Sequence, residues 1–280
     1  ISPRKRFCMP NGEAVVHTYK YGDIPTEAKG LERIYYKSES SEPVVTESII
    51  DFDEREVFVN AEASYENGEY IPVPEYIQPF IFKNPYIAGL TELNDGTISA
   101  LTFGQNPSVC DRYCPDVYLL QSDDKGLSWQ LRGTVASSTD EVPYGYSGDG
   151  NEASLAASGN GDLLCAMRMD MSINPDIAKP ICDTMLAISH NDGFTWEKPF
   201  SVADSSVTPH IVALDNGILI LIYGRPGVHF KISEDNGKSW SEPHSIIGLT
   251  LEEERKNGKS DAQSKYFDTS SYSNTFVEKI

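Results

Sequence analysis

Residues 122–129 read Ser-Asp-Asp-Lys-Gly-Leu-Ser-Trp, and the chain repeats their pattern twice more, at residues 189–196 and 233–240. All three copies fit Ser-x-Asp/Asn-x-Gly-x-x-Trp, and each of the three tryptophans of the chain is the last residue of a copy. Internal repetition of this kind indicates an architecture built from equivalent units. The repeat therefore sets the register in which the rest of the chain is compared.

Each copy has the residues of a tight turn between two strands. A Ser hydroxyl and an Asp or Asn side chain bond backbone N–H groups within a turn, Gly takes a positive φ that a side chain resists, and Trp gives the next strand a large apolar ring to bury. One acid or amide per turn provides too few oxygens for calcium. The residues predict a structural turn, which follows strand-like runs at 117–121, 185–188 and 228–232.

The length and charge of the chain limit the classes of partner that it can bind. With 280 residues, 42 Asp and Glu against 23 Lys and Arg, and a formal charge of −19, the chain is large enough for an ample core and strongly acidic. This charge argues against nucleic acid and anionic membranes as partners, but it permits a small acidic ligand in a cleft with its own Arg cluster. No apolar stretch approaches the 18 or so residues of a membrane span, and residues 1–6 do not form a signal peptide.

The five cysteines do not have the spacing of a zinc site, and neither a metal nor a cofactor is predicted. Cys110 and Cys114 could close a small disulfide loop. The alternative is a set of free thiols in a β core, formed by these two together with Cys8, Cys165 and Cys182.

Between the turns, the chain follows one order: strand, Asn/Asp-Gly hairpin, strand, strand, Ser-Asp-Gly-Trp turn, strand. Asn/Asp-Gly pairs between apolar runs are strong hairpin signals. Four antiparallel strands per unit, repeated radially, predict the blades of an all-β propeller. The predicted units cover about 11–55, 77–135, 150–203 and 206–245, with a partial unit from 268.

Three other segments complete the prediction. Residues 1–10 are a basic lead-in and residues 53–76 an acidic surface loop. Thr250 to Glu253 fits a capping box, which predicts a short helical insertion at 250–257. The chain ends within the first strand of its last unit, so we expect a single propeller domain that is incomplete, a fragment of about four and a half blades.

Three such turns on a four-stranded repeat resemble the Asp-box (bacterial neuraminidase, BNR) repeats of the sialidase superfamily. The resemblance covers most of residues 77–280 and, more weakly, 11–55. It implies a six-bladed propeller for the full protein, with the turns on the rim away from the active centre. Because Asp-box turns also occur in propellers that are not enzymes, function depends on residues between the turns.

The same resemblance implies four site residues. Sialidases have a Glu opening one blade, an Arg on the second strand of that blade, an Arg in the next blade and then a Tyr. Glu152, Arg168, Arg225 and Tyr272 occupy these places in this chain. Two Arg suit a substrate carboxylate. Sialidases use a Tyr nucleophile, because the sugar carboxylate would repel an acidic one, and the neutral phenol needs a base. Tyr272 would therefore attack while Glu152 takes its proton.

Two elements of the family pattern are less clear in this chain. The early Arg-Ile-Pro-like motif that holds a third carboxylate-binding Arg is absent, and Arg4 falls near the equivalent offset before the turn at Asn11-Gly12. The candidates for the general acid, an Asp on an early blade in the family, are Asp23 and Asp111.

The resemblance therefore implies a sialidase-like exo-glycosidase that hydrolyses a terminal acidic sugar with retention, secreted to an extracellular or periplasmic location. Its partner would be an acidic glycan or a sialylated glycoconjugate, and it would need no cofactor. Two alternatives stay open: a propeller that binds acidic glycans without cleaving them, and a glycosidase or lyase that acts on uronic-acid polysaccharides.

Overall fold

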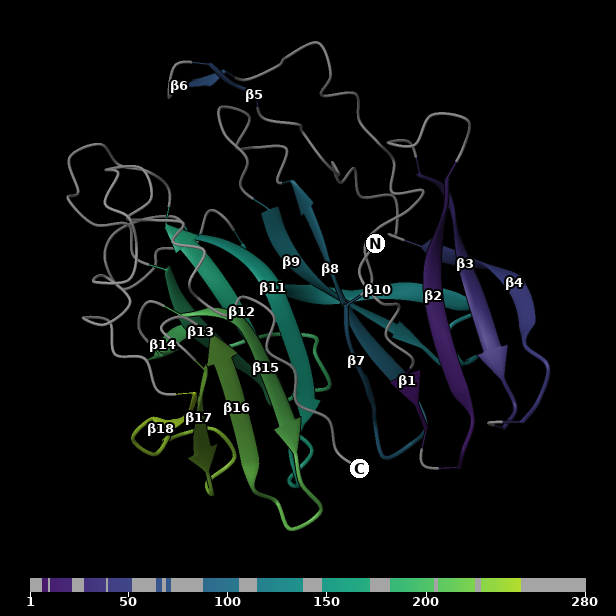
Figure 1. Ribbon diagram of the computed structural model, residues 1–280. Helices are drawn as coiled ribbons and strands as arrows, with labels where there is room; N and C mark the ends of the chain where they lie inside the picture. Colours follow the sequence, from purple (N-terminus) through teal and green to yellow (C-terminus); the bar gives the residue numbers. More distant parts are fainter. Residues whose placement is uncertain are drawn as a thin grey trace. The chain divides into compact units, whose positions relative to one another are not determined.

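The structure is a computed structural model, which describes residues 7–9, 11–21, 28–38, 40–51, 64–66, 69–71, 88–105, 115–137, 148–171, 182–203, 206–224 and 228–247 (Figure 1). Within these ranges the chain forms strands and turns and contains no helix, which confirms the expected all-β class. The helix predicted at 250–257 lies outside the described residues. The chain divides into two compact units, Ile1–Tyr113 with Tyr118–Gly133, and Cys114–Val117 with Thr134–Ile280.

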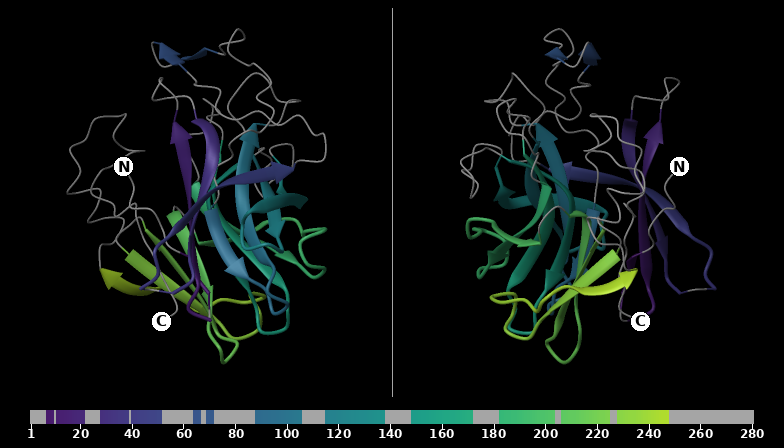
Figure 2. Two further views of the ribbon diagram at one scale, coloured as in Figure 1. Left: turned by 90° about the vertical axis from the view of Figure 1, so that its right-hand side faces the viewer. Right: turned by 60° about the vertical axis from the view of Figure 1, so that its left-hand side comes forward.

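The first unit is built on an eight-stranded sheet with the order β1-β2-β3-β4-β10-β9-β8-β7. Figure 2 shows these strands, coloured from purple to teal. The sheet consists of two sets of four strands, which join where β4 pairs in parallel with β10. The sequence predicts neither this parallel pairing nor β1, which lies in the expected lead-in. The strands are β1 (Phe7–Cys8), β2 (Ala14–Tyr21), β3 (Ala28–Tyr36), β4 (Val44–Asp51), β7 (Ala88–Glu92), β8 (Ile98–Gln105), β9 (Pro115–Ser122) and β10 (Ser128–Ala136); β5 (Ser64–Glu66) and β6 (Glu69–Ile71) form a separate pair.

The second unit contains two four-stranded antiparallel sheets whose strands follow one another in chain order. Each sheet therefore has the form of a propeller blade. The strands are β11 (Gly148–Ala157), β12 (Leu163–Met171), β13 (Cys182–Ser189) and β14 (Phe200–Ala203), then β15 (Val207–Ala213), β16 (Leu219–Gly224), β17 (Val228–Ser233) and β18 (His244–Ile247).

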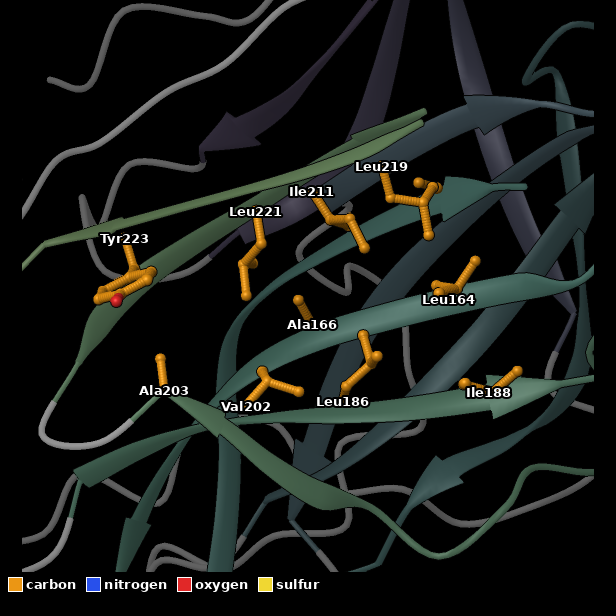
Figure 3. Packing of buried hydrophobic residues seen from close by; sticks show 11 residues of the cluster. Leu164, Ala166, Leu186, Ile188, Val202, Ala203, Ile211, Leu219, Leu221 and Tyr223 are labelled. Carbon is orange, nitrogen blue, oxygen red and sulfur yellow. The ribbon is translucent and has the colours of Figure 1, made fainter. Parts of the chain in front are cut away.

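The two blades of this unit bury one shared layer of apolar side chains (Figure 3). Leu219, Leu221 and Tyr223 alternate along β16, so they point to the same face of their sheet. Leu164 on β12 and Leu186 on β13 lie in the same layer and are completely buried. Each fully buried Leu contributes roughly 1.5–3 kcal/mol. This core places the first strands of the two blades, β11 and β15, side by side.

Four inner hairpins have the same construction, including the one in the unit that lacks a full Ser-Asp-Gly-Trp turn. In each, an Asn or Asp side chain accepts a hydrogen bond from the backbone N–H two residues later, and a Gly with positive φ follows that Asn or Asp. The pairs are Asn11–Glu13 (3.0 Å), Asp95–Thr97 (2.9 Å), Asn160–Asp162 (3.3 Å) and Asn216–Ile218 (3.1 Å), and the glycines are Gly12, Gly96, Gly161 and Gly217, with φ of 82°, 87°, 92° and 83°.

The three Ser-x-Asp/Asn-x-Gly-x-x-Trp segments are the predicted self-bonded turns. In each, the Gly N–H donates to the Ser hydroxyl, which itself donates to the Asp or Asn, and that Asp or Asn accepts the backbone N–H four residues later. The Gly N to Ser Oγ distances are 2.7 Å for Gly126–Ser122, 2.9 Å for Gly193–Ser189 and 2.9 Å for Gly237–Ser233.

The first turn is more deeply enclosed than the other two. Trp129 is 0% exposed and donates its indole N–H to Ser48 Oγ on β4 at 3.1 Å. His17 Nε2 on β2 lies 3.1 Å from the carbonyl oxygen of Gly126, and burial lowers the pKa of His17 to about 4. A neutral His17 therefore donates to that carbonyl. Strands far away in the sequence complete this copy of the turn.

Replacing Gly237 with Ala is expected to lower the free energy of unfolding by roughly 2–5 kcal/mol. A Cβ at this position would stand 2.4 Å from Leu164 Cδ2 in the closed core, at a φ of +87°. Overpacking costs about 1–3 kcal/mol, and the left-handed backbone adds about 1–2 kcal/mol.

The matched control for this change is Gly217→Ala. Gly217 has a φ of +83°, but nothing lies within 4 Å of its added Cβ, so only the backbone cost of about 1–2 kcal/mol applies. Urea denaturation of both variants measures the difference. If the two variants lost the same unfolding free energy, packing of the turn against Leu164 would contribute nothing to stability.

Both cysteine side chains that the structure describes are free thiols, Cys8 exposed and Cys165 buried. Burial raises the pKa of the Cys165 thiol far above its usual range, so this group is an inert part of the core. Cys110 and Cys114 lie outside the described residues. No helix in the described part of the chain is long and apolar enough to cross a membrane.

Candidate active site

The first strand of one blade carries a β-bulge at the predicted catalytic Glu. Along β11 the register shifts between Asn151 and Ser154. Glu152 and Ala153 therefore stand opposite the single residue Met167 of β12. Bulges of this kind redirect side chains and are over-represented next to active sites.

The first strand of the next blade has the same irregularity. Along β15 the register shifts between Val207 and His210, so that Thr208 and Pro209 stand opposite the single residue Tyr223 of β16. Proline has no N–H to give to a ladder and is tolerated in a sheet at such bulges. The sequence therefore favours the bulge at this position.

The leading residue of each bulge has a left-handed backbone. Glu152 has a φ of 46° and Thr208 a φ of 48°. A third bulge, on β7, has Gly89 with a φ of 56° in the corresponding place. Glycine adopts this conformation at little cost, whereas other residues pay about 1–3 kcal/mol, and such strain clusters at functional sites.

The Glu152 carboxylate joins the two bulges. Its Oε2 accepts hydrogen bonds from Arg168 Nη1 at 3.2 Å, from the Thr208 N–H at 2.9 Å and from Thr208 Oγ1 at 3.2 Å. The Glu152 side chain is 37% exposed and that of Arg168 is 15% exposed. No donor among the described residues reaches Oε1. All three of these hydrogen bonds thus go to one oxygen of the carboxylate.

The position of Arg168 is determined by the pairing of β12 with its two neighbouring strands. It pairs with Asn151 on one side and with Thr184 of β13 on the other. Thr184 is fully buried, and its hydroxyl lies 2.6 Å from that of Ser206. The stem of Arg168 therefore follows a packed strand, while its guanidinium group reaches the exposed carboxylate of Glu152.

The ion pair and the Ser-Asp-Gly-Trp turns lie at opposite ends of the blade. Leu163, where β12 leaves the inner hairpin, pairs with Ser189, which begins the second turn. Arg168 is five residues further along β12, roughly 16 Å at the rise of a strand. The turns therefore belong to the hairpin end, and Glu152 belongs to the other end.

The structure brings together two of the four predicted site residues, Glu152 and Arg168. Arg225 and Tyr272 lie outside the described residues, as do the weaker candidates Arg4, Asp23 and Asp111.

Thr208 is a site residue that sequence reasoning missed. The signal was present in the register: Thr208 stands nine residues before the hairpin glycine Gly217, as Glu152 stands nine residues before Gly161. The blade repeat therefore aligns the two positions, but it does not show that the first strands of neighbouring blades face each other at their bulges.

Other titratable groups lie at the hairpin end of the blade. His190 contacts Asp162 Oδ1 at 2.8 Å and Glu197 Oε1 at 3.2 Å, and these carboxylates raise the pKa of His190. The described residues contain no group of three or more His, Cys, Asp or Glu side chains arranged to hold a metal ion.

Comparison with known proteins gives matches in fold. No family model matches the chain, and no curated protein matches it by sequence. Among solved structures, a Hadza microbial sialidase, Hz136, matches with a TM-score of 0.56 and 12% identity, over 89% of this chain and 47% of the sialidase.

Two further structures match at a similar level. A protein of unknown function from Dyadobacter fermentans DSM 18053 has a TM-score of 0.51 and 15% identity, over 88% of this chain and 82% of its own. An exo-β-1,3-galactanase from Phanerochaete chrysosporium has a TM-score of 0.50 and 10% identity, over 88% of this chain and 50% of its own. At such identities the similarity shows the fold. The chain spans about half the length of the sialidase and of the galactanase.

Proposed function

We propose that this chain is part of a sialidase-like exo-glycosidase, which releases a terminal acidic sugar of the sialic acid type with retention. The observation that carries the proposal is the contact between Glu152 and Arg168 at a strained, exposed bulge, at the blade end opposite the repeat turns. The fold similarity to a sialidase and to another exo-acting glycosidase supports it.

Glu152 is the proposed base. Three donors hold its Oε2, and its Oε1, which no donor of the described residues reaches, would take the proton from a hydroxyl group. A base must lie within hydrogen-bond reach of the proton that it abstracts, so a fixed carboxylate with one open oxygen is well suited to this role.

Arg168 and Arg225 are the proposed ligands of the substrate carboxylate. Gly224, the last described residue before Arg225, pairs with Val207, the residue that precedes Thr208. The chain continues from this pair into Arg225, which supports assigning Arg225 to the same site as Glu152. Two permanently charged guanidinium groups there would attract an acidic sugar despite the formal charge of −19 on the whole chain.

Tyr272 is the proposed nucleophile. Its oxygen would bond to the anomeric carbon while the bond to the leaving-group oxygen breaks, and Glu152 would take the phenol proton. An acid, for which Asp23 and Asp111 are the candidates, would protonate the leaving group. Water would then hydrolyse the glycosyl-tyrosine, and two inversions give net retention. The proposal includes a single six-bladed propeller domain and an extracellular or periplasmic location.

The test is hydrolysis of a panel of fluorogenic glycosides by the full-length protein that carries this chain. The sialoside should be cleaved, with the α-anomer released first in the NMR spectrum, and Tyr272→Phe should abolish cleavage. Binding to sialylated glycans without cleavage would replace the enzyme by a glycan-binding propeller. Cleavage of a glucuronide alone would move the substrate class to uronic acids.

A further inference from the structure

Thr208 makes two of the three hydrogen bonds to Glu152 Oε2, yet the proposed mechanism gives it no role. Its backbone N–H donates at 2.9 Å and its hydroxyl at 3.2 Å. The third bond comes from Arg168, which a substrate carboxylate would also engage. The two hydrogen bonds from Thr208 would therefore stay in place when a substrate carboxylate engages Arg168.

The β15 bulge explains why this N–H points at a carboxylate. The register shift between Val207 and His210 removes Thr208 from the ladder with β16, and its left-handed backbone at a φ of 48° directs the N–H elsewhere. A β-branched residue is a poor choice for this conformation. Glycine, present at the corresponding position of β7 as Gly89, would avoid the strain but would carry no hydroxyl.

A second bond fixes the two strands at this position. Ser154 Oγ on β11 accepts the backbone N–H of Ile211 on β15 at 3.2 Å, and Ser154 is buried. Glu152 and Ser154, two residues apart on β11, thus both accept from β15. The buried hydrogen bond between Ser154 and Ile211 therefore helps to set the distance between β11 and β15 at Glu152 and Thr208.

We propose that Thr208 is a positioning residue for the base. By occupying Oε2 it orients the carboxylate so that Oε1 is the oxygen that exchanges the proton. This inference rests on the proposed glycosidase activity. It gives the neighbouring blade a second contribution to catalysis, through Thr208, in addition to the proposed role of Arg225.

Three substitutions in the full-length protein separate the hydroxyl from the backbone strain. Thr208→Val keeps the shape and the strain but loses the hydroxyl. Thr208→Gly loses the hydroxyl and relieves the strain. Thr208→Ser keeps the hydroxyl. Because a hydrogen bond to a charged group is worth a factor of about 10–100, Val and Gly should each lower kcat about tenfold or more on the sialoside, with KM within about twofold.

The stability of each variant distinguishes a positioning role from a structural one. Thr208→Gly should have a thermal midpoint equal to or above that of the wild type, because it relieves the strain, yet a low kcat. Thr208→Ser should retain most of the activity. The positioning role alone would be overturned if Thr208→Val and Thr208→Gly both kept the wild-type kcat. It would also be overturned if kcat fell in proportion to the thermal midpoint across the three variants. A wild-type protein that cleaves no glycoside would overturn the proposed function, and this inference with it.

Discussion

Replacing Glu152 with Gln is expected to lower kcat by about a hundredfold to ten-thousandfold on a substrate that the wild-type protein cleaves. General base catalysis by a positioned side chain contributes a factor of about 10²–10⁴. The Gln amide has nearly the shape of the carboxylate and its oxygen can still accept from Thr208, so the site should stay in place while the base is lost. Steady-state kinetics with a fluorogenic sialoside measure the effect.

The control for this change is Glu197→Gln. Glu197 lies in the second Ser-Asp-Gly-Trp turn region, where its 55% exposed side chain contacts His190 at the hairpin end of the same blade. The Glu197→Gln change removes the same charge from the same blade without touching Glu152, so kcat should stay within about twofold, as expected for a surface site. If the two variants behave alike, or if Glu152→Gln keeps full activity, Glu152 is not the base.

Replacing Trp129 with Ala is expected to lower the free energy of unfolding by about 3–5 kcal/mol, as removal of a buried aromatic ring does. The ring is 0% exposed, packs edge-on against His17 with 5.3 Å between centroids, and bonds Ser48. Its loss leaves a cavity and removes the donor that Ser48 Oγ accepts. Urea denaturation, followed by the fluorescence of the remaining tryptophans, measures the change.

The other two copies of the turn are internal controls. Trp196 and Trp240 are only half-buried, and their indole N–H groups donate at 3.1 Å to Gly193 and Gly237 within their own turns. Their replacement by Ala should therefore cost less than that of Trp129. Equal losses in all three variants would mean that the turn itself, rather than the packing of β4 and β2 around it, determines the stability.

The turns and hairpins could be predicted from the sequence because their bonds are local. The hydrogen bond from Gly126 N to Ser122 Oγ spans four residues, and that from Thr97 N to Asp95 Oδ1 spans two. Residue types at fixed short offsets are sufficient to specify them. The same locality gave the strand order within each blade, whereas the prediction that Glu152 and Arg168 belong to one site came from the resemblance to sialidases.

The difference between Trp129 and the other two tryptophans could not be predicted in this way. The turn sequences are equivalent, and the deep burial of Trp129 comes from β4 and β2, whose Ser48 and His17 are 81 and more than 100 residues away. Nothing in a local pattern indicates that β4 would pair in parallel with β10. Such pairing depends on which sheet edges meet in the folded chain.

The sequence by itself determined the class of the protein, an all-β chain of propeller blades. Its resemblance to sialidases predicted a site between the repeat turns, formed by Glu152, Arg168, Arg225 and Tyr272. Only the tertiary structure decided how that carboxylate is held. Thr208 acts through a backbone N–H, a left-handed φ and a strand from the next blade. The residue type does not specify where a backbone N–H points. Its direction toward Glu152 is known only once the fold has brought the two bulges together.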